Sequence, residues 1–139
     1  MSDLDDLFDT ARAAQARAYA PYSGFRVGSA IRDETGRLHA GCNVENAAYP
    51  VGTCAEAGAV AAMILRGGTR IAEILVVGDG EGLVTPCGGC RQRIREFSDP
   101  ETLVHIAGPE GVRRSFQLDE LLPFSFGPDN LAASEGGRS

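Results

Sequence analysis

Three cysteines and one glutamate have the residue types and spacing of a catalytic metal site. Cys87 and Cys90 form a C-x-x-C pair, and Cys54 is followed two residues later by Glu56. Both groups are predicted to open helices, where the positive end of the helix dipole favours a thiolate. Three thiolates occupy three of the four positions around Zn²⁺ and leave one to water, which is the ligand count of a catalytic zinc site.

Glu56 supplies the proton transfer that such a site needs. Zinc lowers the pKa of a bound water to about 7, so that hydroxide forms at neutral pH. We expect Glu56 to take the proton from this water and to pass it to a substrate nitrogen and a leaving amine. The C-x-E sequence followed at a distance by P-C-x-x-C is the signature of zinc-dependent deaminases in its three-cysteine form.

The cysteines also have other interpretations. C-x-x-C alone occurs in redox pairs and in closed Cys₄ zinc sites, in which Cys42 would be the fourth ligand. A non-catalytic module with structural zinc therefore stays an alternative, although such a site needs no carboxylate like Glu56. Disulfides are disfavoured because the chain shows no secretory signal. We assign Cys42 to packing on a strand and expect one zinc ion per chain.

Alternating helices and strands must position these residues. Apolar spacings of three and four, alternation, and glycine or proline stops predict the elements. The predicted helices are 4–19, 54–65, 91–97 and 118–122, and the predicted strands are 25–31, 38–44, 71–77, 103–106 and 112–116. Together they predict an α/β domain with a mixed sheet covered on both faces. We expect residues 1–131 to form a single domain and residues 132–139 a frayed tail.

Composition disfavours several classes of protein. Nineteen acidic residues against thirteen basic ones, all arginine, give a net charge of −6, which argues against a nucleic-acid partner because such binding draws on clustered positive charge. No apolar run approaches the length needed to cross a bilayer, and the acidic first residues differ from a signal peptide. We therefore expect a cytoplasmic protein that acts on a small molecule, without nucleic-acid or membrane partners.

Segments along nearly the whole chain resemble the cytidine deaminases of the short, homotetrameric bacterial class. The matching segments are Ala20-Pro21-Tyr22-Ser23, Phe25-Arg26-Val27-Gly28, Gly41-Cys42-Asn43-Val44-Glu45-Asn46-Ala47, Tyr49-Pro50, Cys54-Ala55-Glu56, Pro86-Cys87-Gly88-Gly89-Cys90-Arg91-Gln92, Leu121-Leu122-Pro123 and Ser125-Phe126-Gly127-Pro128. This combination is far more specific than C-x-x-C alone.

The resemblance implies a three-layer α/β/α sandwich around a five-stranded mixed sheet. It also implies hydrolytic deamination of free cytidine and 2′-deoxycytidine to uridine and 2′-deoxyuridine, with release of ammonia, as in pyrimidine salvage. Cys54, Cys87 and Cys90 match the zinc ligands of the family, and Glu56 matches its proton shuttle.

Further residues match the family's substrate contacts. Asn43 and Glu45 match the pair that holds the ribose 3′-hydroxyl, and alternate residues of a strand do point to one face. An amide and a carboxylate can together donate to and accept from a sugar hydroxyl. Phe25 matches an aromatic residue of the pyrimidine pocket, and the backbone of Ala55 matches a hydrogen-bonding partner of the base edge.

Three other residues match positions that reach into a neighbouring subunit, which implies a homotetramer with composite active sites. They are Ala47, Tyr49 and Phe126. Aromatic residues are common at such interfaces.

The chain departs from the family pattern beside Glu56. Many members carry arginine at the next position, where it offsets the charge of the thiolates, whereas this chain has Ala57. We expect the two helix N-termini and Arg91 to offset that charge instead. The C-A-E-A run also occurs in blasticidin deaminases, so a modified cytosine nucleoside is an alternative substrate. A deaminase of bases within nucleic acid is disfavoured by the net charge and by Glu45, which would repel a 3′-phosphate.

Overall fold

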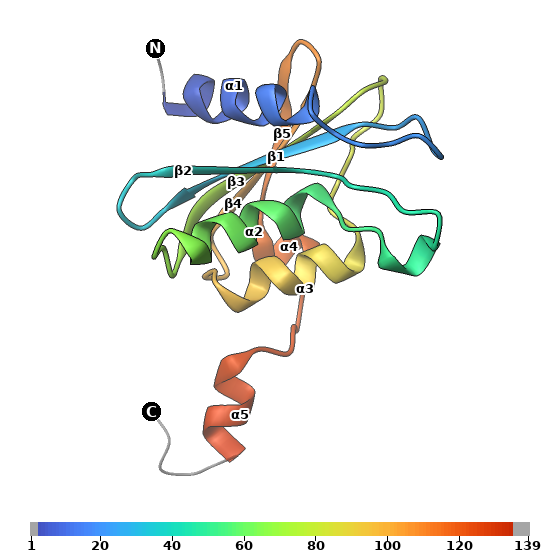
Figure 1. The fold of residues 1–139 in the computed structure, drawn as a ribbon. Coiled ribbons are helices and arrows are strands. Elements are labelled where there is room, and N and C mark those ends of the chain that lie inside the picture. Colours follow the sequence, from blue (N-terminus) through green and yellow to red (C-terminus); the bar gives the residue numbers. More distant parts are fainter. Residues whose placement is uncertain (1–2, 135–139) are drawn as a thin grey trace.

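The computed structural model describes residues 3–134 and contains five strands with helices on both sides (Figure 1). The strands are β1 (Val27–Asp33), β2 (Leu38–Cys42), β3 (Ile71–Gly78), β4 (Leu103–Gly108) and β5 (Gly111–Gln117). The helices are α1 (Asp3–Gln15), α2 (Ala55–Leu65), α3 (Gly88–Glu96), α4 (Leu118–Leu121) and α5 (Pro128–Ser134), with a 3₁₀ turn at Tyr49–Val51.

The strands form one mixed sheet in the order β2-β1-β3-β4-β5. β3 and β4 are parallel, and the other neighbouring pairs are antiparallel. Helix α3 lies between β3 and β4 in the chain, as a parallel connection requires. The prediction of a five-stranded mixed α/β sheet is confirmed.

Helices cover both faces of the sheet. α1 lies on one face, whereas α2 and α3 lie side by side on the other (Figure 1). Successive residues of β3 point to opposite faces of the sheet. Leu75 and Val77 pack with Leu7 of α1 on one face. Ile74 packs with Met63 of α2 and Ile94 of α3 on the other face. Burial on both sides explains why residues 71–77 are almost continuously aliphatic.

Two glycines let helices approach the sheet closely. A Cβ on Gly41 would lie 2.7 Å from the carbonyl carbon of Gly58 in α2. A Cβ on Gly28 would lie 2.7 Å from the backbone nitrogen of Gln15 in α1. Gly28 pairs with Cys42 and Gly41 with Ser29, so the two glycines occupy successive registers of one ladder and face opposite sides of the sheet.

The ends of several elements differ from the sequence prediction. α1 ends at Gln15, because the chain then turns and the Tyr19 N–H donates to the Asn43 carbonyl at 3.0 Å. α3 begins three residues before the predicted helix at 91, since the poor helix formers Gly88 and Gly89 conceal its first turn. The 3₁₀ turn and α5 were not predicted.

The C-terminal tail expected at 132–139 overlaps α5, which extends to Ser134, and its remaining residues lie outside the described part of the chain. α5 stands away from the sheet and its covering helices (Figure 1). Within residues 3–134, no helix is both long and apolar enough to traverse a lipid bilayer.

Candidate active site

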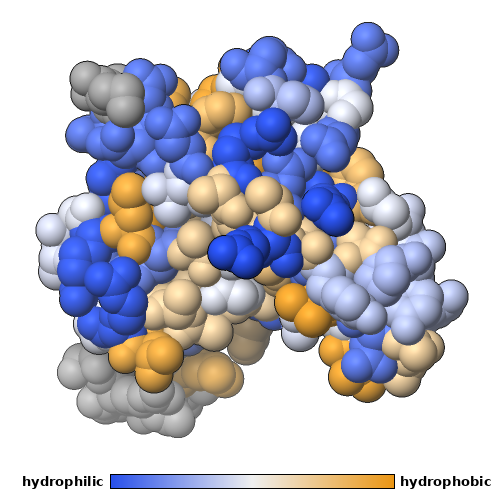
Figure 2. Space-filling model, turned by 45° about the horizontal axis from the view of Figure 1, so that its top comes forward, coloured by the Kyte–Doolittle hydropathy of each residue, from blue (hydrophilic) through white to orange (hydrophobic). Residues whose placement is uncertain are grey.

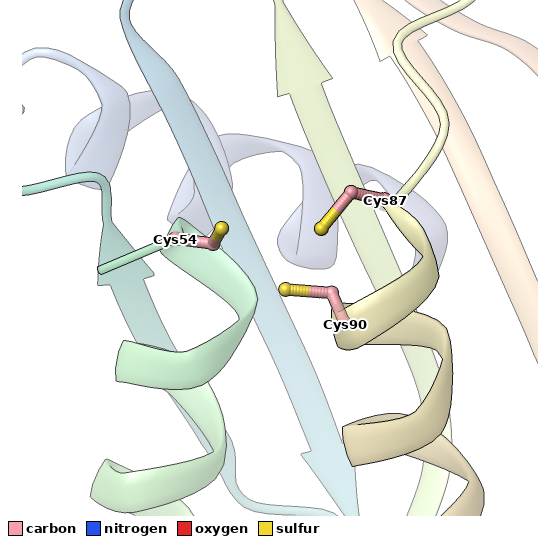
Figure 3. A group of neighbouring side chains, drawn as sticks. All are labelled: Cys54, Cys87 and Cys90. Carbon is pink, nitrogen blue, oxygen red and sulfur yellow. The ribbon is translucent and has the colours of Figure 1, made fainter. Parts of the chain in front are cut away.

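Cys54, Cys87 and Cys90 converge at the adjacent N-termini of α2 and α3. Cys54 caps α2 and Cys87 caps α3, while Cys90 lies in the first turn of α3. Their sulfur atoms all lie within 4.8 Å of one another, and the three side chains point toward a common centre (Figure 3). The sequence prediction that these three cysteines share one site is confirmed.

The sulfur atoms fit a zinc ion. Zn–S bonds of about 2.3 Å in a tetrahedral site place the sulfurs roughly 3.8 Å apart, which agrees with the observed grouping. Thiolates also suit zinc better than they suit Mg²⁺ or Ca²⁺. Cys42 lies on β2, is partly buried, and does not belong to this group. Three protein ligands would leave one zinc position for water.

The environments of the three thiols differ. Burial raises the pKa of Cys90 strongly and that of Cys54 as well. The pKa of Cys87 is lowered, chiefly because its sulfur accepts a hydrogen bond from the backbone N–H of Cys90, which is the effect expected at a helix N-terminus. Hydrogen bonds with the Cys90 and Cys54 thiols and with the Gly89 N–H act in the same direction. Zinc binding must therefore displace protons from Cys54 and Cys90, and the affinity for zinc depends on pH.

Glu56 lies in the first turn of α2 and is buried, with 4% of its surface exposed. Burial raises the pKa of its carboxyl group, and the charge of Arg93 opposes this effect in part. A carboxyl group whose pKa moves toward neutrality can both accept and return a proton, which is the property of a general acid and base.

A cavity of about 310 Å³ opens beside the thiols. Cys54, Ala55, Glu56 and Cys87 line one part of it, so that the zinc site and the carboxyl group face the same space. The other lining residues are Val27, Asn43, Val44, Glu45, Tyr49, Gly52, Thr53, Val76, Val84 and Thr85. This volume lies at the lower end of the range for sites that bind small molecules.

Asn43 and Glu45 are held by contacts with the segment that enters β1. The Asn43 amide accepts a hydrogen bond from the Val27 N–H at 2.9 Å and donates one to the Phe25 carbonyl at 2.8 Å. Glu45 accepts from the Ser23 hydroxyl and from the N–H groups of Tyr22 and Ser23, each at 3.0 Å. These bonds, chiefly that from the Ser23 hydroxyl, lower the pKa of Glu45.

Of the remaining predicted site residues, Tyr49 lines the cavity, whereas Phe25, Ala47 and Phe126 are not among the residues that line it. Tyr49 also contacts Tyr22 edge to face, with ring centroids 6.0 Å apart. Phe25, Tyr49 and Phe126 expose 41%, 74% and 58% of their surface. These aromatic residues therefore do not belong to the core of this chain.

The guanidinium of Arg91 is hydrogen-bonded to groups other than the thiols, and its expected role in offsetting their charge stays a prediction. Its guanidinium donates to the carbonyls of Pro86 and Leu121 and to the Thr85 hydroxyl, at 2.7, 2.8 and 3.2 Å. It thereby ties the loop before α3 to α4. Arg93 instead donates from Nη1 to the Cys90 sulfur at 3.5 Å.

Sequence reasoning did not assign Arg93 or seven of the residues that line the cavity, which are Val27, Val44, Gly52, Thr53, Val76, Val84 and Thr85. Arg93 could have been identified from its spacing, because it is three residues after Cys90 and residues three apart on a helix lie on one face. Val27 could also have been identified, because it is two residues from Phe25 on a predicted strand and alternate residues of a strand share one face. Val84 and Thr85 come from a glycine-rich loop with no such pattern, and only the tertiary structure brings them to the cavity.

Comparisons with known proteins agree with this geometry. Residues 1–106 match the family described as the cytidine and deoxycytidylate deaminase zinc-binding region. The chain is 44% identical over 130 residues to a cytidine deaminase of Mycobacterium tuberculosis, covering 93% of each protein. It is 37% identical over 130 residues to a cytidine deaminase of Sporosarcina psychrophila, covering 94% of this chain and 96% of the relative.

Solved structures show the same fold. A cytidine deaminase crystal structure from Burkholderia pseudomallei superposes with a TM-score of 0.84 at 39% identity, covering 91% of this chain and 100% of that chain. The matches span nearly the full length of both proteins, and the three thiols and Glu56 lie within the matched region. The chain therefore belongs to the cytidine and deoxycytidylate deaminase family of zinc-binding enzymes.

Proposed function

We propose that this chain catalyses the hydrolytic deamination of free cytidine and 2′-deoxycytidine, yielding uridine or 2′-deoxyuridine and ammonia. The observation that carries the proposal is the position of Glu56, buried and facing the same cavity as the three thiols. A purely structural zinc site needs neither an adjacent cavity nor a buried carboxyl group. Near full-length similarity to cytidine deaminases supports this substrate class.

Each group of the site has a chemical task. Cys54, Cys87 and Cys90 would hold Zn²⁺, which when bound would supply an activated water for attack on C4 of the base. Glu56 takes a proton from that water and delivers it to the ring nitrogen. It then moves the second proton to the amino group, so that the C4–N bond breaks, ammonia leaves and the C4 carbonyl forms. Burial raises the pKa of Glu56 above its ordinary value, which favours its taking up the proton before it returns it.

Asn43 and Glu45 are proposed to bind the ribose 3′-hydroxyl. Glu45 is ionised, and it and Asn43 line the cavity beside the thiols. Their hydrogen bonds to residues 22–27 hold them in place before a ligand arrives, which reduces the entropy lost on binding. We assign the backbone of Ala55 to the base edge and the ring of Phe25 to the pyrimidine.

We further propose a homotetramer with composite sites. Tyr49 and Phe126 are aromatic, and most of their surface is exposed. Apolar side chains also reach the surface in several separate patches (Figure 2). Phe126 lies two residues before the start of the projecting helix α5 (Figure 1). We assign Ala47, Tyr49 and Phe126 to the site of a neighbouring subunit.

Residues 1–131 would act as one catalytic domain. The role that fits deamination of free cytosine nucleosides is pyrimidine salvage in the cytoplasm. Cytosine nucleosides are single small molecules, so the acidic chain needs no basic groove to bind them.

A substrate panel tests the proposal. The protein is mixed with cytidine, 2′-deoxycytidine, cytosine, CMP, adenosine and blasticidin S, and ammonia release and the ultraviolet spectrum are followed. We expect turnover of the first two compounds. Preference for blasticidin S would move the assignment to a modified nucleoside, and zinc binding without turnover of any compound would indicate a structural zinc module.

A further inference from the structure

Arg93 places a positive charge against one of the zinc ligands. Its Nη1 lies 3.5 Å from the sulfur of Cys90, which is within hydrogen-bonding distance for the larger sulfur atom. The two residues are three apart on α3, and helical side chains lean toward the N-terminus of their helix. The Arg93 side chain therefore runs back along α3 toward the first turn, where Cys90 lies.

The first turn of α3 leaves room for this arrangement. Gly89 is one turn before Arg93, and a Cβ added to Gly89 would lie 3.5 Å from Arg93 Nη1. The guanidinium thus passes over Gly89, where the helix carries no side chain. A longer side chain at this position would compete with the guanidinium for the same space.

The other two arginines of α3 point elsewhere. Arg91 donates to the Pro86 and Leu121 carbonyls. Arg95 binds the Ser125 hydroxyl and the Asp129 carboxylate, each at 2.8 Å. Of the three, Arg93 is the one directed at the sulfur group.

We propose that Arg93 is a positioning residue for zinc: its guanidinium donates a hydrogen bond to the Cys90 sulfur and, once zinc is bound, offsets part of the negative charge of the three thiolates. Three thiolates exceed the charge of one zinc ion, and Cys90 is completely buried away from water. A hydrogen bond from a cation stabilises the charged form of such a ligand. Groups that bind the ligands of a metal in this way tune its affinity.

The alternative is that Arg93 is an ordinary solvated surface residue whose contact with sulfur has no effect. The residue is exposed as a whole, so solvent weakens its electrostatic interaction. We therefore expect an effect at the lower end of the range for such partners. The proposal rests on the zinc site and is independent of which nucleoside the enzyme accepts.

The test measures zinc affinity in the intact protein by competition with a chromophoric chelator. Arg93→Gln is expected to weaken zinc binding about tenfold. Arg93→Lys should fall between that variant and the parent, because an ammonium keeps the charge but lacks the planar fork of the guanidinium. Arg17→Gln is the matched control, since Arg17 is an exposed arginine outside α2 and α3 and its loss changes the net charge equally.

A spectroscopic measurement separates a direct effect on sulfur from a general loss of stability. With Co²⁺ in place of zinc, the thiolate-to-metal charge-transfer band should move to longer wavelength in Arg93→Gln, because the sulfur loses a hydrogen bond that lowers the energy of its lone pairs. Circular dichroism checks that each variant is folded. If Arg93→Gln does not fold, the zinc affinity and the band position of Arg93→Lys are compared with those of the parent instead.

Equal zinc affinity and an unmoved band in Arg93→Gln would overturn the proposal. An affinity of Arg93→Lys as low as that of Arg93→Gln would overturn the role of charge. Failure of the proposed function looks different, because a parent protein inactive on cytidine would still show the dependence of zinc affinity on Arg93.

Discussion

Gly41→Ala should damage the zinc site from a distance, by moving the helix that carries Cys54 and Glu56. The added Cβ would lie 2.7 Å from the Gly58 carbonyl carbon and closer still to the Ala55 oxygen and the Ala59 nitrogen, whereas ordinary contacts begin at 3.4 Å. All three atoms are backbone atoms of α2, so no side chain can rotate away. The helix must shift relative to β2 by at least the missing 0.7 Å.

This shift is large for a metal site. Zinc–ligand distances are held to about 0.2 Å, and a misplacement of about 1 Å at a catalytic group can lower activity about 100-fold. Overpacking itself should destabilise the fold by about 1 to 3 kcal/mol. We therefore expect Gly41→Ala to remain folded, to bind zinc more weakly, and to lose kcat/KM by up to about 100-fold.

Gly28→Ala is the matched control. Its Cβ would collide as closely with the backbone of α1, on the other face of the same strand pair, and α1 carries none of the thiols. Urea unfolding, chelator competition and kcat/KM for cytidine are measured for both variants. We expect similar losses of stability, with the loss of zinc affinity confined to Gly41→Ala. Equal zinc affinity in the two variants would refute the reasoning.

Three further predictions concern Glu56, Phe126 and Asp33. Glu56→Gln should lower kcat by about 10² to 10⁴ with zinc retained, and loss of zinc by metal analysis would instead make Glu56 a structural residue. Phe126→Ala should raise KM for cytidine with zinc retained, and unchanged kinetics would remove Phe126 from the site. Burial alone would raise the pKa of Asp33, but hydrogen bonds from His39 and Thr35 hold this pKa well below its usual range. The ionised Asp33 carboxylate therefore stabilises the fold at neutral pH. This stabilisation is lost as the pH falls below about 4, where the unfolded chain takes up the proton first. The urea midpoint should therefore fall more steeply with acid in the parent than in Asp33→Asn, and parallel curves would contradict this.

The sequence alone predicted the zinc ligands because their chemistry depends on local spacing. A cysteine at a helix N-cap and another three residues later must lie close together, and Glu56 is within one turn of Cys54. The five strands were also predictable, since residues 71–77 are aliphatic and the hairpin alternates around a turn. These patterns involve residues close together in the chain, so they can be recognised without knowledge of the fold.

Helix ends were less predictable because they depend on distant contacts. α1 ends where Tyr19 joins Asn43, and α3 begins at glycines that propensity assigns to a loop. Arg91 and Arg93 show the same limit at the site. Both lie near Cys90 in the sequence. Helical spacing favours Arg93 as the neighbour of Cys90, but the binding of Arg91 to the distant Leu121 carbonyl is determined by the fold.

The sequence by itself thus predicted which residues carry the chemistry, namely three thiols and one carboxyl group. The tertiary structure decided how they meet. Close approach at Gly41 sets the distance between α2 and the sheet, and the parallel pairing of β3 and β4 brings α3 beside α2. These relations join residues that are far apart in the chain, so they depend on packing and not on local spacing.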